Sequence, residues 1–279
     1  MKTWTQVTAT LDTLPEDWAA WHEVFEQSGI NGTVVTDVPA TITGYAYEPT
    51  EQELETLLRI LGERGATVTT GVVHEEDWAE SWKQFFKPRR IGKRFVVRPT
   101  WEDFAAGPED LEIVLDPGQS FGTGDHPTTR MCLMLLETLD LTGKTVADVG
   151  CGTGILSVGA CLLGAESVEA GDIEENCVES SEENAVRNNV KFPVVLSKGF
   201  DAFPESATYD VVLSNIISAA LIILAPEAAK RVNPGGFWIV SGVIHSNWPD
   251  VLAAAQRVGF ELTNRLEEDD WVAAQFTRL

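Results

Sequence analysis

The sequence predicts an α/β chain in two parts, a small α+β domain over residues 1–74 and a larger domain over residues 101–279. Two observations predict this division of the 279 residues, a length that suits one large or two ordinary domains. The first is a βαββαβ order of strand and helix patterns in the smaller part. The second is the alternation of buried strands with helices from residue 112 on, which is typical of a mostly parallel sheet wound on both faces.

The smaller domain is predicted element by element. Residues 3–11 alternate apolar and polar side chains, which indicates a strand, and Pro15 opens a helix with aromatic residues at helical spacing. "GTVVTD", "ATITGYAY" and "ATVTTGVV" predict three more strands. Thr50 and Glu53 form a capping-box pattern at the start of the second helix. This order is the ferredoxin-like arrangement, which by itself names no ligand.

Residues 75–100 are predicted to be a linker between the two domains. Four aromatic residues, Trp78, Trp82, Phe85 and Phe86, lie at helical spacing. The segment carries 7 basic and 4 acidic side chains in a chain of net charge −23. A helix that docks by its aromatic face is the simpler interpretation, and a basic and aromatic patch that contacts a partner is the alternative.

The larger domain alternates strands and helices. Its predicted strands are "TVADV", "SVEAGDI", "FPVVLSKG", "YDVVLSNI", "GGFWIVSGVI" and "WVAAQFTRL", and its clearest helices are "ILSVGACLLGA", "SAALIILAPEAAKRV" and "WPDVLAAAQRVG". In a parallel sheet of this kind, ligands bind at the carboxyl ends of the strands.

Composition excludes several classes of function. The net charge of −23 leaves no basic stripe for nucleic acid, and it suits either a basic protein partner or solubility alone. No apolar run approaches the roughly 18 residues that span a bilayer, and "MKTWTQVTAT" lacks the apolar core of a signal peptide, so we expect a cytoplasmic protein. The four cysteines lack the spacing of a metal site and are expected to be reduced.

A glycine-rich turn is the predicted chemical centre. "DVGCGTG" places Gly150, Gly152 and Gly154 between a strand and a helix, with G-x-G-x-G spacing rather than the G-x-G-x-x-G of dinucleotide binders. Asp172 ends the next strand, where a carboxylate can accept two hydrogen bonds from a ribose diol. A nucleoside that carries an amino acid instead of a pyrophosphate is S-adenosylmethionine, so these residues predict that cofactor. A structural turn followed by a solvated aspartate is the alternative.

Two more elements point to the same edge of the sheet. Asn215 ends a strand, where its carbonyl can accept a hydrogen bond from a substrate amine, although asparagine is also a common turn former. "GQSFGTGDHPTT", residues 118–129, is either a loop before a capped helix or a segment that offers amides and hydroxyls to a ligand. His126 is the nearest candidate for a general base, and a capping role fits its position better.

The motifs "SFGTGDHPTTRMCL", "VADVGCGTGILSVGA" and "VVLSNII" resemble the ribosomal protein L11 methyltransferase (PrmA) family in order and spacing. The resemblance implies a Rossmann-like class I methyltransferase domain with a seven-stranded sheet, preceded by a ferredoxin-like substrate-recognition domain. It also implies transfer of methyl groups from S-adenosylmethionine to amino groups of ribosomal protein L11, by a monomer that needs no metal. The implied cofactor contacts are Phe121, Thr129, Gly150, Gly152, Asp172 and Asn215, of which Asn215 also positions the target amine.

The chain departs from the family pattern at Asp125, which adds a negative charge beside the cofactor, and in its strongly acidic surface. Two other functions remain open from the sequence. One is a methyltransferase that acts on small molecules or on other proteins, and the other is a module that binds S-adenosylmethionine without catalysis.

Overall fold

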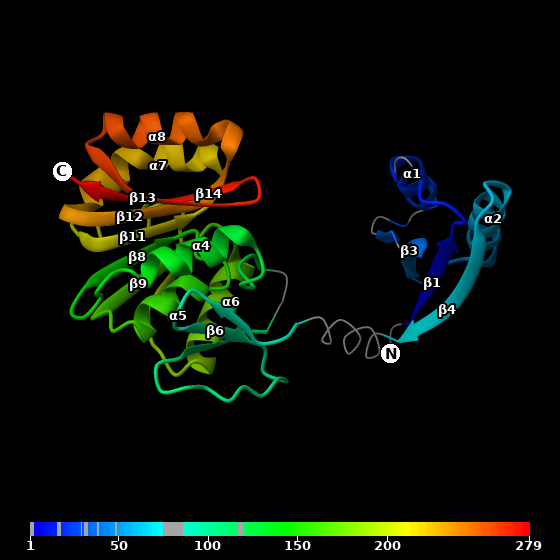
Figure 1. The fold of residues 1–279 in the computed structure, drawn as a ribbon, viewed down its shortest axis with the longest axis horizontal. Coiled ribbons are helices and arrows are strands. Elements are labelled where there is room, and N and C mark those ends of the chain that lie inside the picture. Colours follow the sequence, from blue (N-terminus) through cyan, green and yellow to red (C-terminus); the bar gives the residue numbers. More distant parts are fainter. Residues whose placement is uncertain are drawn as a thin grey trace. The chain divides into compact units, whose positions relative to one another are not determined.

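The computed structural model describes residues 3–15, 18–28, 30, 33–37, 39–47, 49–74, 86–116 and 120–279. The chain divides into two units, residues 1–85 and residues 86–279 (Figure 1). No helix in the described part of the chain is long and apolar enough to cross a membrane.

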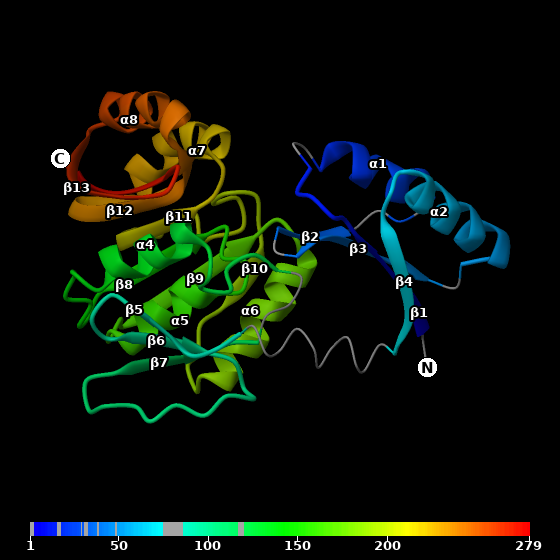
Figure 2. The same cartoon turned by 45° about the vertical axis from the view of Figure 1, so that its right-hand side comes forward.

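The first unit has the predicted βαββαβ order. Its elements are β1 (Thr3–Thr10), α1 (Ala19–Gln27), β2 (Thr33–Asp37), β3 (Ala40–Tyr47), α2 (Glu51–Glu63) and β4 (Thr67–His74). The strands form an antiparallel sheet in the order β2-β3-β1-β4, and both helices lie on one face of it (Figure 2).

The core of this unit explains the alternation in its strands. Val7 and Ile42 point from the sheet to Phe25 of α1 and Leu57 of α2, and all four side chains are buried. Helix α1 begins at Ala19, later than the Pro15 start that the sequence indicates. At α2, the capping box is confirmed, because Thr50 and Glu53 each accept a hydrogen bond from the backbone of the other.

The predicted linker is divided between described and undescribed residues. Residues 75–85, which hold three of its four aromatic side chains, lie outside the described part of the chain. Residues 86–100 belong to the second unit, where β5 (Arg89–Ile91) and β6 (Phe95–Arg98) form a small sheet with β7 (Leu111–Val114). The second half of the segment is therefore folded into the larger unit, because Ile91 and Phe95 are buried in its core.

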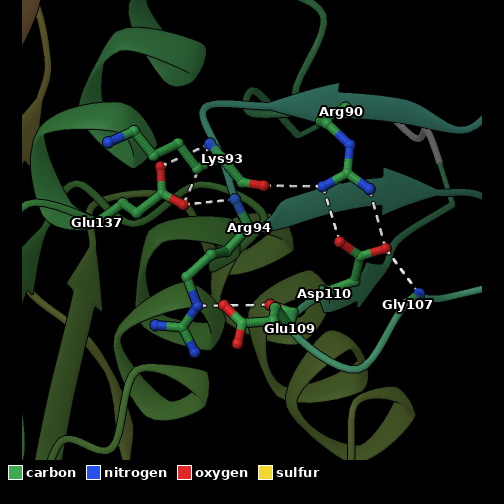
Figure 3. Close-up of polar contacts among 7 residues, drawn as sticks. All are labelled: Arg90, Lys93, Arg94, Gly107, Glu109, Asp110 and Glu137. Atoms are coloured by element: carbon green, nitrogen blue, oxygen red, sulfur yellow. Dashed lines mark hydrogen bonds and ion pairs between the residues drawn. The ribbon is translucent and has the colours of Figure 1, made fainter.

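Polar contacts hold this small sheet in place (Figure 3). The guanidinium of Arg90 donates two hydrogen bonds to the carboxylate of Asp110, at 2.7 and 2.9 Å, and it lowers the pKa of that carboxyl. Glu137 accepts hydrogen bonds from the backbone N–H groups of Lys93 and Arg94 in the turn between β5 and β6. Because Glu137 is the C-cap of helix α4 (Pro127–Leu136), the turn is fixed to that helix.

The second unit is built on a seven-stranded sheet in the order β10-β9-β8-β11-β12-β14-β13. Its strands are β8 (Thr145–Val149), β9 (Ser167–Asp172), β10 (Val194–Leu196), β11 (Tyr209–Asn215), β12 (Val232–Ile244), β13 (Phe260–Glu268) and β14 (Trp271–Arg278). The first five strands in this order are parallel, and β14 is antiparallel to both of its neighbours. This confirms the predicted mostly parallel, seven-stranded sheet, although the sequence patterns did not identify β13.

Helices cover both faces of the large sheet. They are α4, α5 (Ile155–Leu162), α6 (Glu175–Arg187), α7 (Ser218–Arg231) and α8 (Trp248–Arg257), with a 3₁₀ turn η2 (His245–Asn247) before the last. Helices α7 and α8 lie on one face of the sheet, and α4 and α5 lie on the other (Figure 1). Side chains of α7 and α8 belong to one buried core, and those of α4 and α5 belong to a second. The sheet is therefore wound on both faces, as predicted.

Candidate active site

The glycine turn joins the carboxyl end of β8 to the start of α5. Gly150, Gly152 and Gly154 have φ angles of +81°, +54° and +75°, a left-handed region that side chains disfavour. The N–H of Gly150 donates to the carbonyl of Gly171 at 2.8 Å, and the N–H of Gly152 donates to Asp172 Oδ2 at 2.9 Å. The turn is therefore tied to the end of β9.

Two of these glycines are needed because other parts of the protein approach the turn closely. A Cβ on Gly152 would lie 2.3 Å from the carbonyl oxygen of Phe121, and a Cβ on Gly150 would lie 2.3 Å from Ile216 Cγ2. Glycines at a turn of this kind can also allow a ligand to approach the backbone closely. The structure instead places the loop before α4 and the residue after Asn215 against the turn.

Asp172 is buried at the end of β9 and organises the turn. Its Oδ1 accepts the N–H of Glu174 at 3.1 Å, in addition to the bond that Oδ2 accepts from Gly152. A carboxylate offers about four acceptor positions, so two backbone bonds leave capacity for a ribose diol. The predicted role of Asp172 is compatible with this geometry.

Asn215 and Thr129 are brought together from positions 86 residues apart (the last residue of β11 and the first turn of α4). Asn215 Nδ2 donates to Thr129 Oγ1 at 3.4 Å, and Thr129 is fully buried. Asn215 Oδ1 is also buried, and among the described residues it has no hydrogen-bond donor. A buried acceptor without a donor costs about 1–3 kcal/mol, so Oδ1 has capacity for a donor from a ligand or a water molecule.

The loop before α4 lies directly against the glycine turn. Thr153 donates its N–H to the carbonyl of Phe121 at 3.0 Å and its hydroxyl to the carbonyl of Gly122 at 2.6 Å. Phe121 is 54% exposed, so it is available to a ligand at this edge. Residues 120–123 and 125–127 line a groove of about 500 Å³.

His126 caps helix α4. Its Nδ1 accepts the N–H of Thr128 at 3.4 Å and lies 2.7 Å from Thr128 Oγ1. Its ring packs between Phe121 and Trp271, with centroid distances of 5.3 and 4.8 Å. Burial, followed by the charge of Arg130, lowers the pKa of His126. Because Nδ1 accepts the cap bond, the neutral ring carries its proton on Nε2, and the cap accounts for this residue without a role as a base.

Sequence reasoning missed two residues that support the site. Thr153 fixes the loop, as described above. Asp148 is fully buried in β8, where its Oδ2 accepts the Ser157 hydroxyl at 2.6 Å and Oδ1 has no partner among the described residues. Burial raises the pKa of Asp148 to about 7. The signal was the aspartate inside the apolar strand "TVADV".

The six predicted cofactor residues thus lie together at the carboxyl edge of the large sheet. Gly150, Gly152 and Asp172 share hydrogen bonds across β8 and β9, and Phe121 covers the turn. At the end of the neighbouring strand β11, Asn215 contacts Thr129 of helix α4. The arrangement offers a carboxylate to a diol and a buried carbonyl to an N–H donor, which fits S-adenosylmethionine and an amine.

Comparisons with known proteins identify the family of this chain. A model of the ribosomal protein L11 methyltransferase (PrmA) family matches residues 4–279. Relatives named ribosomal protein L11 methyltransferase include one from Desulforamulus reducens, which is 36% identical over 93% of this chain and 94% of its own, and one from Pelotomaculum thermopropionicum, which is 38% identical over 95% of this chain and 96% of its own. The crystal structure of ribosomal protein L11 methylase from Lactobacillus delbrueckii subsp. bulgaricus is similar with a TM-score of 0.65 and 28% identity, covering 69% of this chain and 99% of that chain. This chain belongs to the ribosomal protein L11 methyltransferase family and has its Rossmann-like class I methyltransferase fold.

Proposed function

We propose that this protein transfers methyl groups from S-adenosylmethionine to amino groups of ribosomal protein L11. The observation that carries the proposal is the extent of the family match, which runs over residues 4–279 and includes the small first unit as well as the large sheet. A methyltransferase of small molecules has no need of a separate unit of this size. The first unit is therefore proposed as the part that recognises the protein substrate, in the cytoplasm where ribosomes are found.

The cofactor is proposed to bind at the glycine turn. When bound, S-adenosylmethionine supplies a methyl group on a positively charged sulfur. Asp172 would accept hydrogen bonds from the ribose, because its carboxylate retains acceptor capacity beyond its two backbone bonds. Gly150 and Gly152 keep the turn free of side chains, and the exposed ring of Phe121 would contact the cofactor from the loop.

Asn215 is proposed to position the target amine. Its buried Oδ1 would accept one N–H of the amine and so direct the nitrogen lone pair away from the amide. A lysine with a pKa of ~10.4 must first lose a proton, which costs roughly 4–5 kcal/mol at neutral pH. Burial of the amine beside Asn215 reduces this cost, because a dry environment disfavours the charged form. The proton then leaves to water, since His126 Nδ1 is engaged in the cap of α4.

The proposal is tested with ribosomal protein L11 that carries no methyl groups. The protein is incubated with L11 and S-adenosylmethionine labelled in its methyl group, and intact-mass spectrometry follows the mass of L11. We expect the label on amino groups of L11 in the presence of the wild-type protein, and much less with Asn215→Ala. A labelled small molecule from a cell extract, with L11 left unmodified, would reject the proposal in favour of the small-molecule reaction.

A further inference from the structure

Strand β4 forms one edge of the four-stranded sheet in the first unit. The strand order β2-β3-β1-β4 gives β4 a single neighbouring strand, β1, among the described residues. On its other side, no described residue forms a backbone hydrogen bond with β4. The outer side of β4 therefore presents backbone N–H and C=O groups that can pair with a further strand.

The hydrogen-bond pattern shows which of these groups point outward. Directly after β1, the N–H of Leu11 donates to the carbonyl of Ala40, which lies opposite it when the register of β1 and β3 is continued by one residue. Successive residues of a strand bond to opposite sides, so the even-numbered residues of β1 bond to β4, as Thr8 does to Thr69. The residues of β4 between these bonded positions have N–H groups that point away from the sheet, and they include Val68, Thr70 and Val72.

The two edges of this sheet are protected to different degrees. Proteins usually keep an edge strand short or place charged residues and prolines along it, because an open edge pairs with other chains. Strand β2, at the opposite edge, has five residues, ends at Asp37 and is followed by Pro39. Strand β4 has eight residues, "TVTTGVVH", without lysine, arginine, aspartate, glutamate or proline. Only the edge at β4 lacks these protecting features.

The middle of β4 is accessible to a partner. Thr69, Thr70 and Gly71 are exposed, and Val72 is 69% exposed. A Cβ on Gly71 would have no heavy atom within 4 Å, so no described side chain covers the strand at this point. An extended peptide can bind such an edge through its main chain, in the way known as β-augmentation.

Charge favours one kind of partner for this edge. Residues 1–74 carry 3 basic and 11 acidic side chains, which gives a net charge of −8. Two copies of the first unit therefore repel each other. A protein that binds ribosomal RNA is basic, because it has to neutralise phosphates, and it is attracted to an acidic surface. The charge thus favours L11 over a second copy of this chain.

We propose that β4 binds an extended segment of L11, which adds a fifth strand to the sheet of the first unit. The inference rests on the proposed function, since it names the surface through which the first unit recognises L11. Main-chain hydrogen bonds to β4 supply the pairing, and the negative charge of the unit attracts the basic partner.

The test replaces Val72 by proline in the full-length protein. Proline removes the outward N–H of residue 72 and leaves the hydrogen bonds between β4 and β1 in place, which is the position where an edge strand tolerates proline. The dissociation constant for L11, measured by calorimetry, should rise on the order of tenfold, because a backbone hydrogen bond is lost and the ring obstructs the added strand. The affinity for S-adenosylmethionine should stay at the wild-type value.

Two variants serve as matched controls. Val72→Ala shortens the side chain but keeps the N–H, so its affinity for L11 should stay near wild type. Val35→Pro makes the same backbone change in β2, where the alternation of hydrogen bonds also directs the N–H of Val35 outward, and it should leave L11 binding unchanged. Urea unfolding of each variant checks that it is folded.

A measurement on the wild-type protein needs no substitution. Amide hydrogen exchange of the full-length protein, followed by NMR, should show that L11 protects the N–H groups of Val68, Thr70 and Val72. The N–H of Val35 should exchange as it does in the free protein. Protection of alternate residues along one strand is the signature of main-chain pairing, and a contact through side chains would not produce it.

The outcomes separate this inference from the proposed function. Equal weakening by Val72→Ala and Val72→Pro, equal weakening by the two prolines, or unprotected β4 amides with L11 bound would overturn the inference, even if L11 is methylated. Protection of the β4 amides without L11, at rising protein concentration, would overturn it in favour of a second copy. If L11 protects these amides but never receives the methyl label, the proposed function fails and the pairing stands. If L11 neither binds nor is methylated, both fail.

Discussion

Replacing Gly152 by alanine should push the loop before α4 away from the glycine turn. The new Cβ would lie 2.3 Å from the carbonyl oxygen of Phe121, which is a backbone atom and cannot rotate aside. The same carbonyl accepts the N–H of Thr153 at 3.0 Å, and the carbonyl of Gly122 accepts the Thr153 hydroxyl at 2.6 Å. Relief of the clash therefore requires that both hydrogen bonds lengthen or break.

The expected loss of stability follows from these contacts. A side chain at a φ of +54° costs about 1 kcal/mol, since the left-handed region disfavours L residues. Each of the two hydrogen bonds contributes about 1 kcal/mol. We therefore expect Gly152→Ala to lower the free energy of unfolding of the second unit by about 3 kcal/mol.

Gly143 provides a matched control. Its φ is +70°, and a Cβ there would have no heavy atom within 4 Å. Gly143→Ala should therefore lower the free energy of unfolding by only about 1 kcal/mol, the cost of a side chain in the left-handed backbone conformation. Urea unfolding of both variants, followed by tryptophan fluorescence, measures the difference between them. Equal losses of stability at Gly143 and Gly152 would refute the argument that the Phe121 carbonyl excludes a side chain.

Four further outcomes follow from the site. Asp172→Asn should weaken binding of S-adenosylmethionine by about 1.5–3 kcal/mol in calorimetry, because a charged acceptor is lost; unchanged affinity would reject the ribose assignment. Asn215→Ala should lower the single-turnover rate more than the cofactor affinity, because displacement of the amine by about 1 Å costs on the order of a hundredfold. Burial raises the pKa of Asp148 from 3.8 to about 7. The contribution of Asp148 to the free energy of unfolding is therefore fully present below about pH 4, where the carboxyl is protonated in both the folded and the unfolded state, and it is lost as the pH rises through 7. Asp148→Asn should accordingly gain stability relative to wild type between about pH 5 and about pH 8, measured by urea unfolding. Residues 86–279 alone should bind S-adenosylmethionine but lose most activity on L11. Retained activity would show that the first unit does not recognise the substrate.

The order of the elements could be predicted because most strands and helices bury one regular set of side chains. Strand β13 escaped prediction because it is an edge strand in which polar side chains, Asn264 and Glu268, stand at two of the less exposed alternate positions, so that its sequence lacks a clear apolar alternation. Strands β5 and β6 were hidden in a segment that its charges and aromatic side chains made resemble a linker. In both places the local pattern is short, and the tertiary neighbours decide the structure.

The residues of the site could be predicted from the sequence, but the contacts between them could not. Glycine spacing, a strand-end aspartate and a strand-end asparagine are each visible in the sequence. The contact between Phe121 and Gly152, and that between Thr129 and Asn215, join segments that are far apart in the chain. No local sequence pattern indicates which distant residue packs against a glycine that has no side chain.

These contacts join the two halves of the site through one segment. The Phe121 carbonyl oxygen lies against Gly152 and accepts the N–H of Thr153, so the loop contacts the turn that is proposed to hold the cofactor. Five residues later, His126 caps the helix whose first turn carries Thr129, and Thr129 contacts the amide of Asn215. A change in the loop must therefore reach both the cofactor side and the amine side. This is the physical reason why the segment directly before α4 contains so many turn-forming residues. The loop has to follow the surface of the glycine turn, and it also has to place the capped start of α4 next to Asn215.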